Sequence, residues 1–350
     1  MPRRFAAPFA DAMLVVALLA ACSSATPSPA RTVPGATAPP SSPPAPTRTP
    51  GPTPIPNPTA LPLGDRILAT LTVDQAPCAL AADATSVWVT SNATGLLDRI
   101  DPATNTVSEH IPAGTGPCGV AVGADGRIWV ADLGLTVGAV LAIDPATSTV
   151  TSRIEHVGPA LWDLKAGFGS IWVVDRTAKQ VLRIDPKTAT VVASIDVGPQ
   201  ASGLAVMPAG VWVSDDTDGS IRRIDPATNT VVETVAIGGA PSWFADDGAA
   251  HLLIATRGSG TVTVVDPATG VAGSSLKGLL QPLDGTVIGT QAWIPDGSRR
   301  WVVAIDLSAA SLAGIPYSLP GALNPFVAEP AFGDVWVLDF GGTTIWRIRA

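Results

Sequence analysis

The segment that decides the fold is residues 100–107, which read IDPATNTV. It returns as IDPATSTV at 143–150, IDPKTATV at 184–191 and IDPATNTV at 224–231, and in shorter form at 265–270 and 305–306. Successive aspartates lie 43, 41, 40, 41 and 40 residues apart, and the last equivalent position, Ile348, follows Ile305 by 43 residues. Seven copies at one period indicate a repeat architecture.

The repeated segment is typical of a hairpin turn. Isoleucine and valine end one strand and begin the next, proline fixes φ at the second turn position, and aspartate and threonine can bond nearby backbone N–H groups. The repeated aspartates are therefore predicted to build turns, not a functional site; they are Asp101, Asp144, Asp185, Asp225, Asp266 and Asp306.

Each repeat contains four short apolar strands. In one repeat they fall at 120–122, 128–130, 139–143 and 149–154. Four strands in about 41 residues predict an all-β fold, a seven-bladed β-propeller with four antiparallel strands per blade. The second strand of most repeats carries a tryptophan that we assign to the core; these are Trp88, Trp129, Trp172, Trp212, Trp293 and Trp336.

The two ends of the repeat region complement each other. Residues 67–73 read as a fourth strand with no blade before it, whereas the last blade stops at its third strand, residues 346–348. The amino-terminal strand is therefore expected to complete the last blade, which closes the ring and leaves no open blade edge.

The amino terminus predicts export. Arg3 and Arg4 precede ten apolar residues, 12–21, which are too few to span a bilayer and match a signal peptide. The ending LAAC at 19–22 resembles the lipobox of bacterial lipoproteins, which implies cleavage before Cys22, its lipidation, and an extracytoplasmic protein anchored to a bacterial membrane. The alternative is an ordinary secretory signal with an incidental cysteine.

A proline-rich segment follows. Fourteen of the 34 prolines lie in residues 23–63, a composition that cannot form a core and favours an extended tether. The expected organisation is a signal peptide at 1–21, a lipidated Cys22 with a tether to residue 63, and a propeller at 64–350. The net charge of −8 argues against nucleic acid as a partner, and we expect a monomer.

The repeated motifs resemble a known family. GPCG at 116–119, IWVAD at 128–132 and IDPATNTV are similar to the YVTN-type and virginiamycin B lyase-like (streptogramin lyase) seven-bladed propellers, over residues 65–350. The lyase branch implies a histidine base just after a blade-start proline, acidic residues on the same face, and Mg2+-assisted opening of a cyclic depsipeptide. The corresponding positions here hold no histidine; they are Cys78, Cys118, Ala160, Ala201, Ser242, Leu283 and Phe326.

The three histidines, His110, His156 and His251, lie elsewhere and are interpreted as surface or edge residues, with His156 the remaining candidate for a base. Second strands end in five acids that propeller topology places around the mouth of the channel: Asp132, Asp175, Asp215, Asp296 and Asp339. They fit either a site for Ca2+, Mg2+ or a cationic ligand, or acceptors for backbone N–H groups in their own turns. Their repetition in nearly every blade favours the turns.

Residues that break the repeat are the better functional candidates. Trp162, Asp163, Trp243 and Phe326 place large or charged side chains at the start of first strands, where they are predicted either to line a ligand face or to plug the channel. Cys78 and Cys118 hold equivalent positions in adjacent blades and can form a disulfide in an exported protein if their Cα atoms lie within about 7 Å.

These observations predict a membrane-anchored propeller that binds a small molecule or protein through one face of the ring. The alternative is a streptogramin B lyase-like enzyme that uses His156 or the aspartate ring. A third hypothesis is a scaffold that binds through blade edges.

Overall fold

The computed structural model describes residues 59–350, apart from 135–136, 159 and 310 and the side chain of His156. The predicted signal peptide, Cys22 and residues 23–58 of the predicted tether lie outside this range. Within it, no helix has the length and apolar character needed to cross a membrane.

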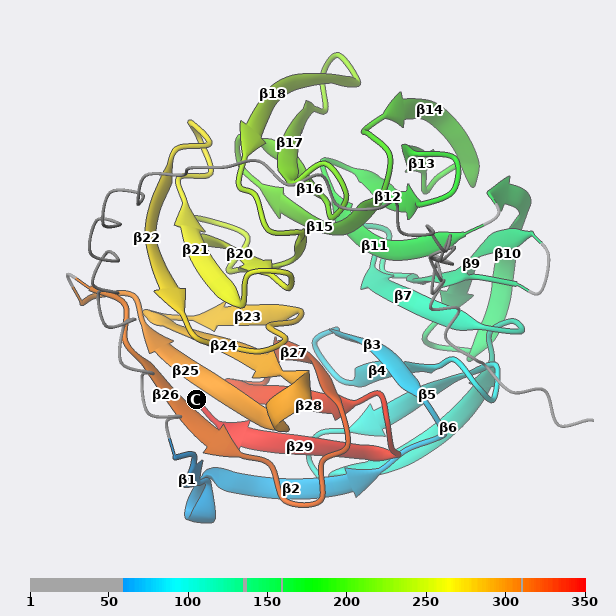
Figure 1. The fold of residues 1–350 in the computed structure, drawn as a ribbon. Coiled ribbons are helices and arrows are strands. Elements are labelled where there is room, and N and C mark those ends of the chain that lie inside the picture. The colour runs from blue at the N-terminus through cyan, green and yellow to red at the C-terminus, as the bar shows by residue number, and fades with distance from the viewer. Residues whose placement is uncertain (1–58, 135–136, 159, 310) are drawn as a thin grey trace, which may run out of the picture. The chain divides into compact units, whose positions relative to one another are not determined.

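The regular secondary structure of the described chain is almost entirely β-strand, and its blades follow one another around a central axis (Figure 1). Blade 1 contains β3 (Pro77–Ala82), β4 (Val87–Ser91), β5 (Leu96–Asp101) and β6 (Thr106–Pro112). Blade 2 contains β7 (Pro117–Val122), β8 (Ile128–Asp132), β9 (Gly138–Asp144) and β10 (Thr149–Gly158). Blade 3 contains β11 (Leu161–Gly167), β12 (Ser170–Asp175), β13 (Gln180–Asp185) and β14 (Thr190–Asp196).

The remaining blades repeat this order. Blade 4 contains β15 (Ala201–Met207), β16 (Gly210–Asp215), β17 (Ser220–Asp225) and β18 (Thr230–Ala236). Blade 5 contains β19 (Pro241–Asp246), β20 (Leu252–Thr256), β21 (Thr261–Val265) and β22 (Ala272–Lys277). Blade 6 contains β23 (Gly285–Ile288), β24 (Gln291–Asp296), β25 (Trp301–Asp306) and β26 (Gly314–Ser318), with the short 3-10 helix η2 (Gly297–Arg299).

Blade 7 closes the ring. It combines β27 (Pro325–Ala331), β28 (Asp334–Asp339) and β29 (Thr344–Arg349) with the amino-terminal strand β2 (Ile67–Thr72). β2 pairs antiparallel with β29, from Ile67 opposite Ile348 to Thr72 opposite Thr344. The predicted seven-bladed architecture and its closure by the amino-terminal strand are confirmed.

Two pairings go beyond the expected pattern. The inner strands β19 and β23 pair in parallel, so blades 5 and 6 form part of one nine-stranded sheet. The same sheet includes β1 (Leu61–Pro62), which pairs with β26 just before the 3-10 helix η1 (Gly64–Arg66). Leu63 is also buried. Residues 61–63, the last part of the predicted tether, therefore pack on the propeller.

The tryptophans of the second strands form the core between blades, because all six are completely buried. An arginine on the third strand stacks on the tryptophan in four blades; in blade 3, Arg183 lies 5.0 Å from the ring centre of Trp172. The Arg183 guanidinium also donates to the carbonyl of Pro226 in the Asp-Pro turn of blade 4, at 2.5 Å. Arg99 and Arg347 make the same bond to the following blade. The repeated turns thus also hold neighbouring blades together.

The turn prediction agrees with the geometry. Asp101 Oδ1 accepts a hydrogen bond from the backbone N–H of Ala103 at 2.8 Å, and Asn105 takes a left-handed conformation with φ of 56°. Bonds from the backbone and from Thr104 hold the pKa of Asp101 below its usual value. These turns lie on the face where the inner strands end, which we call the end face. The opposite face, where the inner strands begin, is the start face.

Candidate functional site: a charged channel between the inner strands

The five aspartates at the ends of second strands lie on the start face, as expected, but each is at most 1% exposed. Asp132 accepts the backbone N–H groups of Thr115 and Gly116 at 3.0 and 2.8 Å, and Asp339 accepts those of Leu323 and Asn324. Asp175, Asp215 and Asp296 also accept backbone N–H groups. This is the geometry of turn formation. Among the described residues, the metal-ligating side chains that gather within 4.8 Å of one another are Asp74, Asp98 and His110, not these.

The three aromatic residues that break the repeat meet one another. The ring centres of Trp162 and Trp243 are 6.4 Å apart, and those of Trp243 and Phe326 are 5.4 Å apart. These rings come from blades 3, 5 and 7, which are not neighbours, so the contacts cross the central axis. Trp243 is only 7% exposed. Their packing agrees with the plug alternative, whereas Trp162 also lines an open hollow on the start face with Arg176 and Gln200, which agrees with a ligand face. We call these three rings the aromatic plug.

Asp163, the fourth candidate of that group, does not face a ligand on the start face. Its two carboxylate oxygens accept the backbone N–H groups of Leu164 at 2.8 Å and Leu204 at 2.7 Å. It therefore links blade 3 to blade 4 from a buried position. Burial raises its pKa, and the charge of Lys165 opposes that shift.

The predicted cysteine pair lies on adjacent inner strands, β3 and β7. The Cα atoms of Cys78 and Cys118 are 5.0 Å apart, and the structure joins the two residues by a disulfide. This separation lies in the range that disulfides require.

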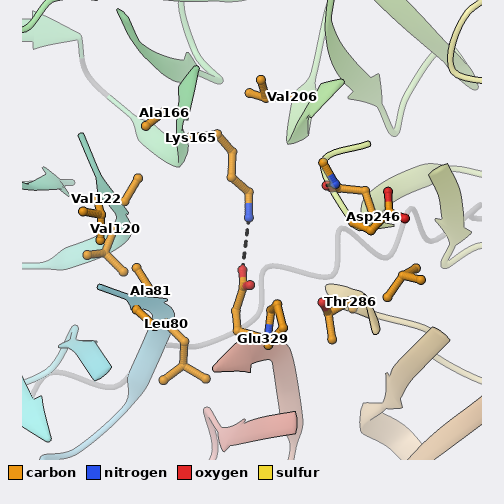
Figure 2. A pocket seen from close by; sticks show the side chains of 17 residues that line it. Leu80, Ala81, Val120, Val122, Lys165, Ala166, Val206, Asp246, Thr286 and Glu329 are labelled. Carbon is orange, nitrogen blue, oxygen red and sulfur yellow. Dashed lines mark hydrogen bonds and ion pairs between the residues drawn. The ribbon is translucent and has the colours of Figure 1, made fainter. Parts of the chain in front are cut away.

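Beyond the aromatic plug, the channel opens into a cavity of about 400 Å³ toward the end face. All seven inner strands contribute to its wall, and about half of the lining residues are alanine, valine or leucine. Figure 2 shows Lys165 and Glu329 pointing toward each other across this space, with Asp246 to one side. Lys165 Nζ lies 3.2 Å from Glu329 Oε1, and about a quarter of each side chain is exposed within the channel.

Carboxyl groups outnumber cations around this cavity. Burial alone would lower the pKa of Lys165, but the charges of Glu329, Asp284, Asp163 and Asp246 outweigh it and raise that pKa well above its usual value. Burial raises the pKa of Glu329, and more strongly that of Asp284, even though Lys165 opposes both shifts. The positive charge of one lysine is thus insufficient to balance the negative charges of the surrounding carboxylates.

Asp246 and Asp247 lie side by side at the end-face rim and differ sharply. Burial raises the pKa of Asp246 to about 6, with Lys165 opposing and Glu329 adding to the shift. Burial also acts to raise the pKa of Asp247, but its bonds to His251 and to the backbone N–H groups of Ala249 and Ala250 lower it to about 2. A positive charge placed beside an acid with a pKa near 6 lowers that pKa and favours the ionised carboxylate at neutral pH.

The sequence prediction missed these channel residues, although the repeat contained a signal. The inner-strand residue that pairs with the core tryptophan is alanine in blades 1, 2 and 4, where it is Ala81, Ala121 and Ala205. The same position is Lys165 in blade 3 and Glu329 in blade 7. A comparison of inner strands position by position would have identified both as exceptions.

Two of the three histidines are placed away from the channel plug. His110 Nδ1 lies 2.8 Å from Asp98 on the outer part of blade 1, and His251 Nδ1 lies 2.7 Å from Asp247. His156, the remaining candidate for a base, is on the outer strand β10, and its side chain lies outside the described atoms.

Comparisons with solved structures agree on the fold. Virginiamycin B lyase from Staphylococcus aureus is similar with a TM-score of 0.68 and 13% identity, over 81% of this chain and 98% of that one. A streptogramin B lyase gives 0.67 and 14%, over 80% and 96%. The Cps50 (Swd1) β-propeller domain of Myceliophteria thermophila gives 0.68 and 11%, over 81% and 99%. No protein-family profile and no curated protein matches the chain. At these low sequence identities the similarity shows a shared fold only. The chain has the β-propeller fold of these proteins.

Proposed function

We propose that this protein is an extracytoplasmic, lipid-anchored propeller that binds a small organic cation with two or more amino groups in its central channel. The observation that carries the proposal is the excess of carboxyl groups around an open cavity of about 400 Å³. Cavities of this size suit small ligands, and a few charged groups set among apolar side chains give orientation and specificity.

The charge balance argues for a cation. Lys165 is engaged by Glu329, whereas Asp246 and Asp284 are held in surroundings that disfavour their ionised forms. An ammonium group placed beside Asp246 would stabilise its carboxylate, and the relief of that unfavourable burial contributes to binding.

The distribution of the acids argues for several amino groups instead of one metal ion. The acids that line the cavity, Asp246, Asp247 and Glu329, come from blades 5 and 7. Among the described residues, no three of the channel acids bring their oxygens within 4.8 Å of one another. A flexible diamine or triamine can contact separated carboxylates at the same time.

The placement outside the cytoplasm rests on the amino-terminal sequence. The lipobox-like ending at Cys22 and the proline-rich segment after it support lipidation and a tether, which at about 3.1 Å per residue can extend roughly 120 Å. Substituting Cys22→Ala should move the protein from the membrane fraction to the soluble fraction. Retention of that variant in the membrane fraction would contradict lipid anchoring.

Isothermal titration of the full chain in detergent with spermidine and putrescine tests the ligand class. Loss of one charged partner typically costs about 1.5–3 kcal/mol, so Asp246→Asn should weaken binding by roughly 10- to 100-fold. Asp185→Asn is the matched control, because it removes the same charge from an outer turn. Absence of spermidine binding, or equal affinity in both variants, would contradict the proposal.

The fold favours a second candidate, a streptogramin B lyase-like activity, because two lyases are among the similar structures. No histidine follows a blade-start proline in this chain. Incubation with a streptogramin B antibiotic and Mg2+ tests it: ring opening that is lost in His156→Ala or Asp132→Ala would support the lyase.

A further inference from the structure

A cluster of three metal-ligating side chains lies far from the channel, where the ring closes. Asp74 is in the connection from β2, the outer strand of blade 7, to β3, the inner strand of blade 1. Asp98 and His110 face each other on β5 and β6 of blade 1. One atom from each of the three lies within 4.8 Å of the others.

Asp98 is the one acid at its position in the repeat. This third-strand position, opposite the residue after the core tryptophan, varies between blades: in blades 2 to 7 it is Leu141, Leu182, Arg222, Thr263, Val303 and Trp346. Asp98 is nevertheless completely buried. A buried carboxylate is costly unless a cation or several donors satisfy it.

The protein's own donors reach both oxygens of Asp98, whose Oδ2 accepts the backbone N–H of Asp74 at 3.1 Å, but they leave one oxygen of Asp74 unsatisfied. His110 Nδ1 lies 2.8 Å from Asp98 Oδ1 and 2.9 Å from Asp74 Oδ2. Nδ1 carries at most one proton, and it is bonded to Asp98. Asp74 Oδ2 is buried and has no hydrogen-bond partner. A proton on Nε2, the other ring nitrogen of His110, cannot satisfy Asp74 Oδ2 either, because the N–H bond at Nε2 points away from the carboxylates that face Nδ1.

We propose that Asp74, Asp98 and His110 bind a Zn2+ ion that ties the ring closure to blade 1. One imidazole nitrogen and two carboxylate oxygens form a ligand set that zinc accepts, with water in the fourth position. A tetrahedral ion with bonds of about 2.1 Å holds its ligand atoms about 3.4 Å apart. The present separations of 2.8 and 2.9 Å need only a small retreat of the His110 ring, whose side chain is 56% exposed.

The ion would give Asp74 Oδ2 a partner and would replace the His110 bond to the buried Asp98. It would also bind the β2–β3 connection to two strands of blade 1, so removal of the metal should loosen the closure of the ring. Ca2+ prefers six or more oxygen ligands and should not replace zinc here.

The test uses the full chain without a histidine tag, dialysed against Zn2+ and analysed for bound metal. The wild-type protein should retain about one Zn2+ per chain and unfold at a higher temperature with Zn2+ than with a chelator. His110→Ala and Asp74→Asn, both at partly exposed side chains, should lose both effects. His251→Ala, which removes the other histidine paired with an aspartate, should keep both.

Failure of the wild-type protein to retain Zn2+ would overturn the proposal. So would equal retention by His110→Ala. A change in stability of His110→Ala that is the same with Zn2+ and with the chelator would show that the cluster is only a hydrogen-bonded group.

Discussion

Replacing Asp246 with asparagine should stabilise the protein near neutral pH. The folded-state pKa is about 6, against 3.8 for an unburied aspartate. The folded state therefore binds the proton more tightly than the unfolded state, and stability falls as pH rises from about 4 to about 6. With about 1.4 kcal/mol for each pH unit between the two values, the ionised carboxylate costs up to about 3 kcal/mol at pH 7.

The asparagine variant would lack this cost, and its side-chain oxygen can still accept the N–H of Gly248, which now lies 2.9 Å from the carboxylate. Urea denaturation should thus show Asp246→Asn to be about 1–3 kcal/mol more stable than the wild type at pH 7, with no difference below about pH 4. The same variant should bind spermidine more weakly, because it lacks the carboxylate that is proposed to contact an ammonium group of the ligand.

The neighbouring Asp247 provides the matched control. Its pKa of about 2 means that its ionised form stabilises the fold, and this contribution is lost as pH falls from about 4 to about 2. Because this residue is exposed, Asp247→Asn should destabilise the protein by only about 1 kcal/mol at pH 7. Destabilisation by Asp246→Asn of the same size at pH 7 and pH 4 would refute the reasoning.

Three other variants test the account of the fold. Cys78→Ser should lower the free energy of unfolding by about 3 kcal/mol in oxidising buffer and leave it unchanged in reducing buffer, as urea denaturation would show; equal loss in both would contradict a disulfide with Cys118. Arg183→Lys should cost about 1–2 kcal/mol in the same assay, because lysine cannot bond the Pro226 carbonyl while stacking on tryptophan; an unchanged midpoint would contradict the inter-blade role. Trp243→Ala should cost about 3–5 kcal/mol by thermal unfolding without weakening spermidine binding, since its ring plugs the other end of the channel; weaker binding would place the ligand at the start face.

The fold was predictable because it repeats. A period of about 41 residues defined the blade, and the unpaired strands at the two ends defined the closure through β2 and β29. The parallel pairing of β19 with β23 was not predictable, because Ala245 and Gly285 meet across the boundary between two blades that are otherwise separate units.

The site was harder to predict for a geometric reason. Inner strands contain a bulge soon after their start, as between Leu161 and Leu164 or between Pro241 and Trp243. The bulge breaks the alternation of faces on which strand patterns depend, so the direction of Trp162 or Asp163 could not be inferred from spacing. The predicted site residues follow the blade-start prolines and therefore lie near the start face. Lys165 and Glu329 lie further along the inner strands, toward the end face.

The measurement that tests the central claim most directly is the affinity for spermidine of the wild type, Asp246→Asn in the channel and Trp162→Ala on the start face. A site in the channel predicts strong weakening in Asp246→Asn and an affinity near that of the wild type in Trp162→Ala. Loss of binding in Trp162→Ala with Asp246→Asn unaffected would contradict the account and return the ligand to the start face.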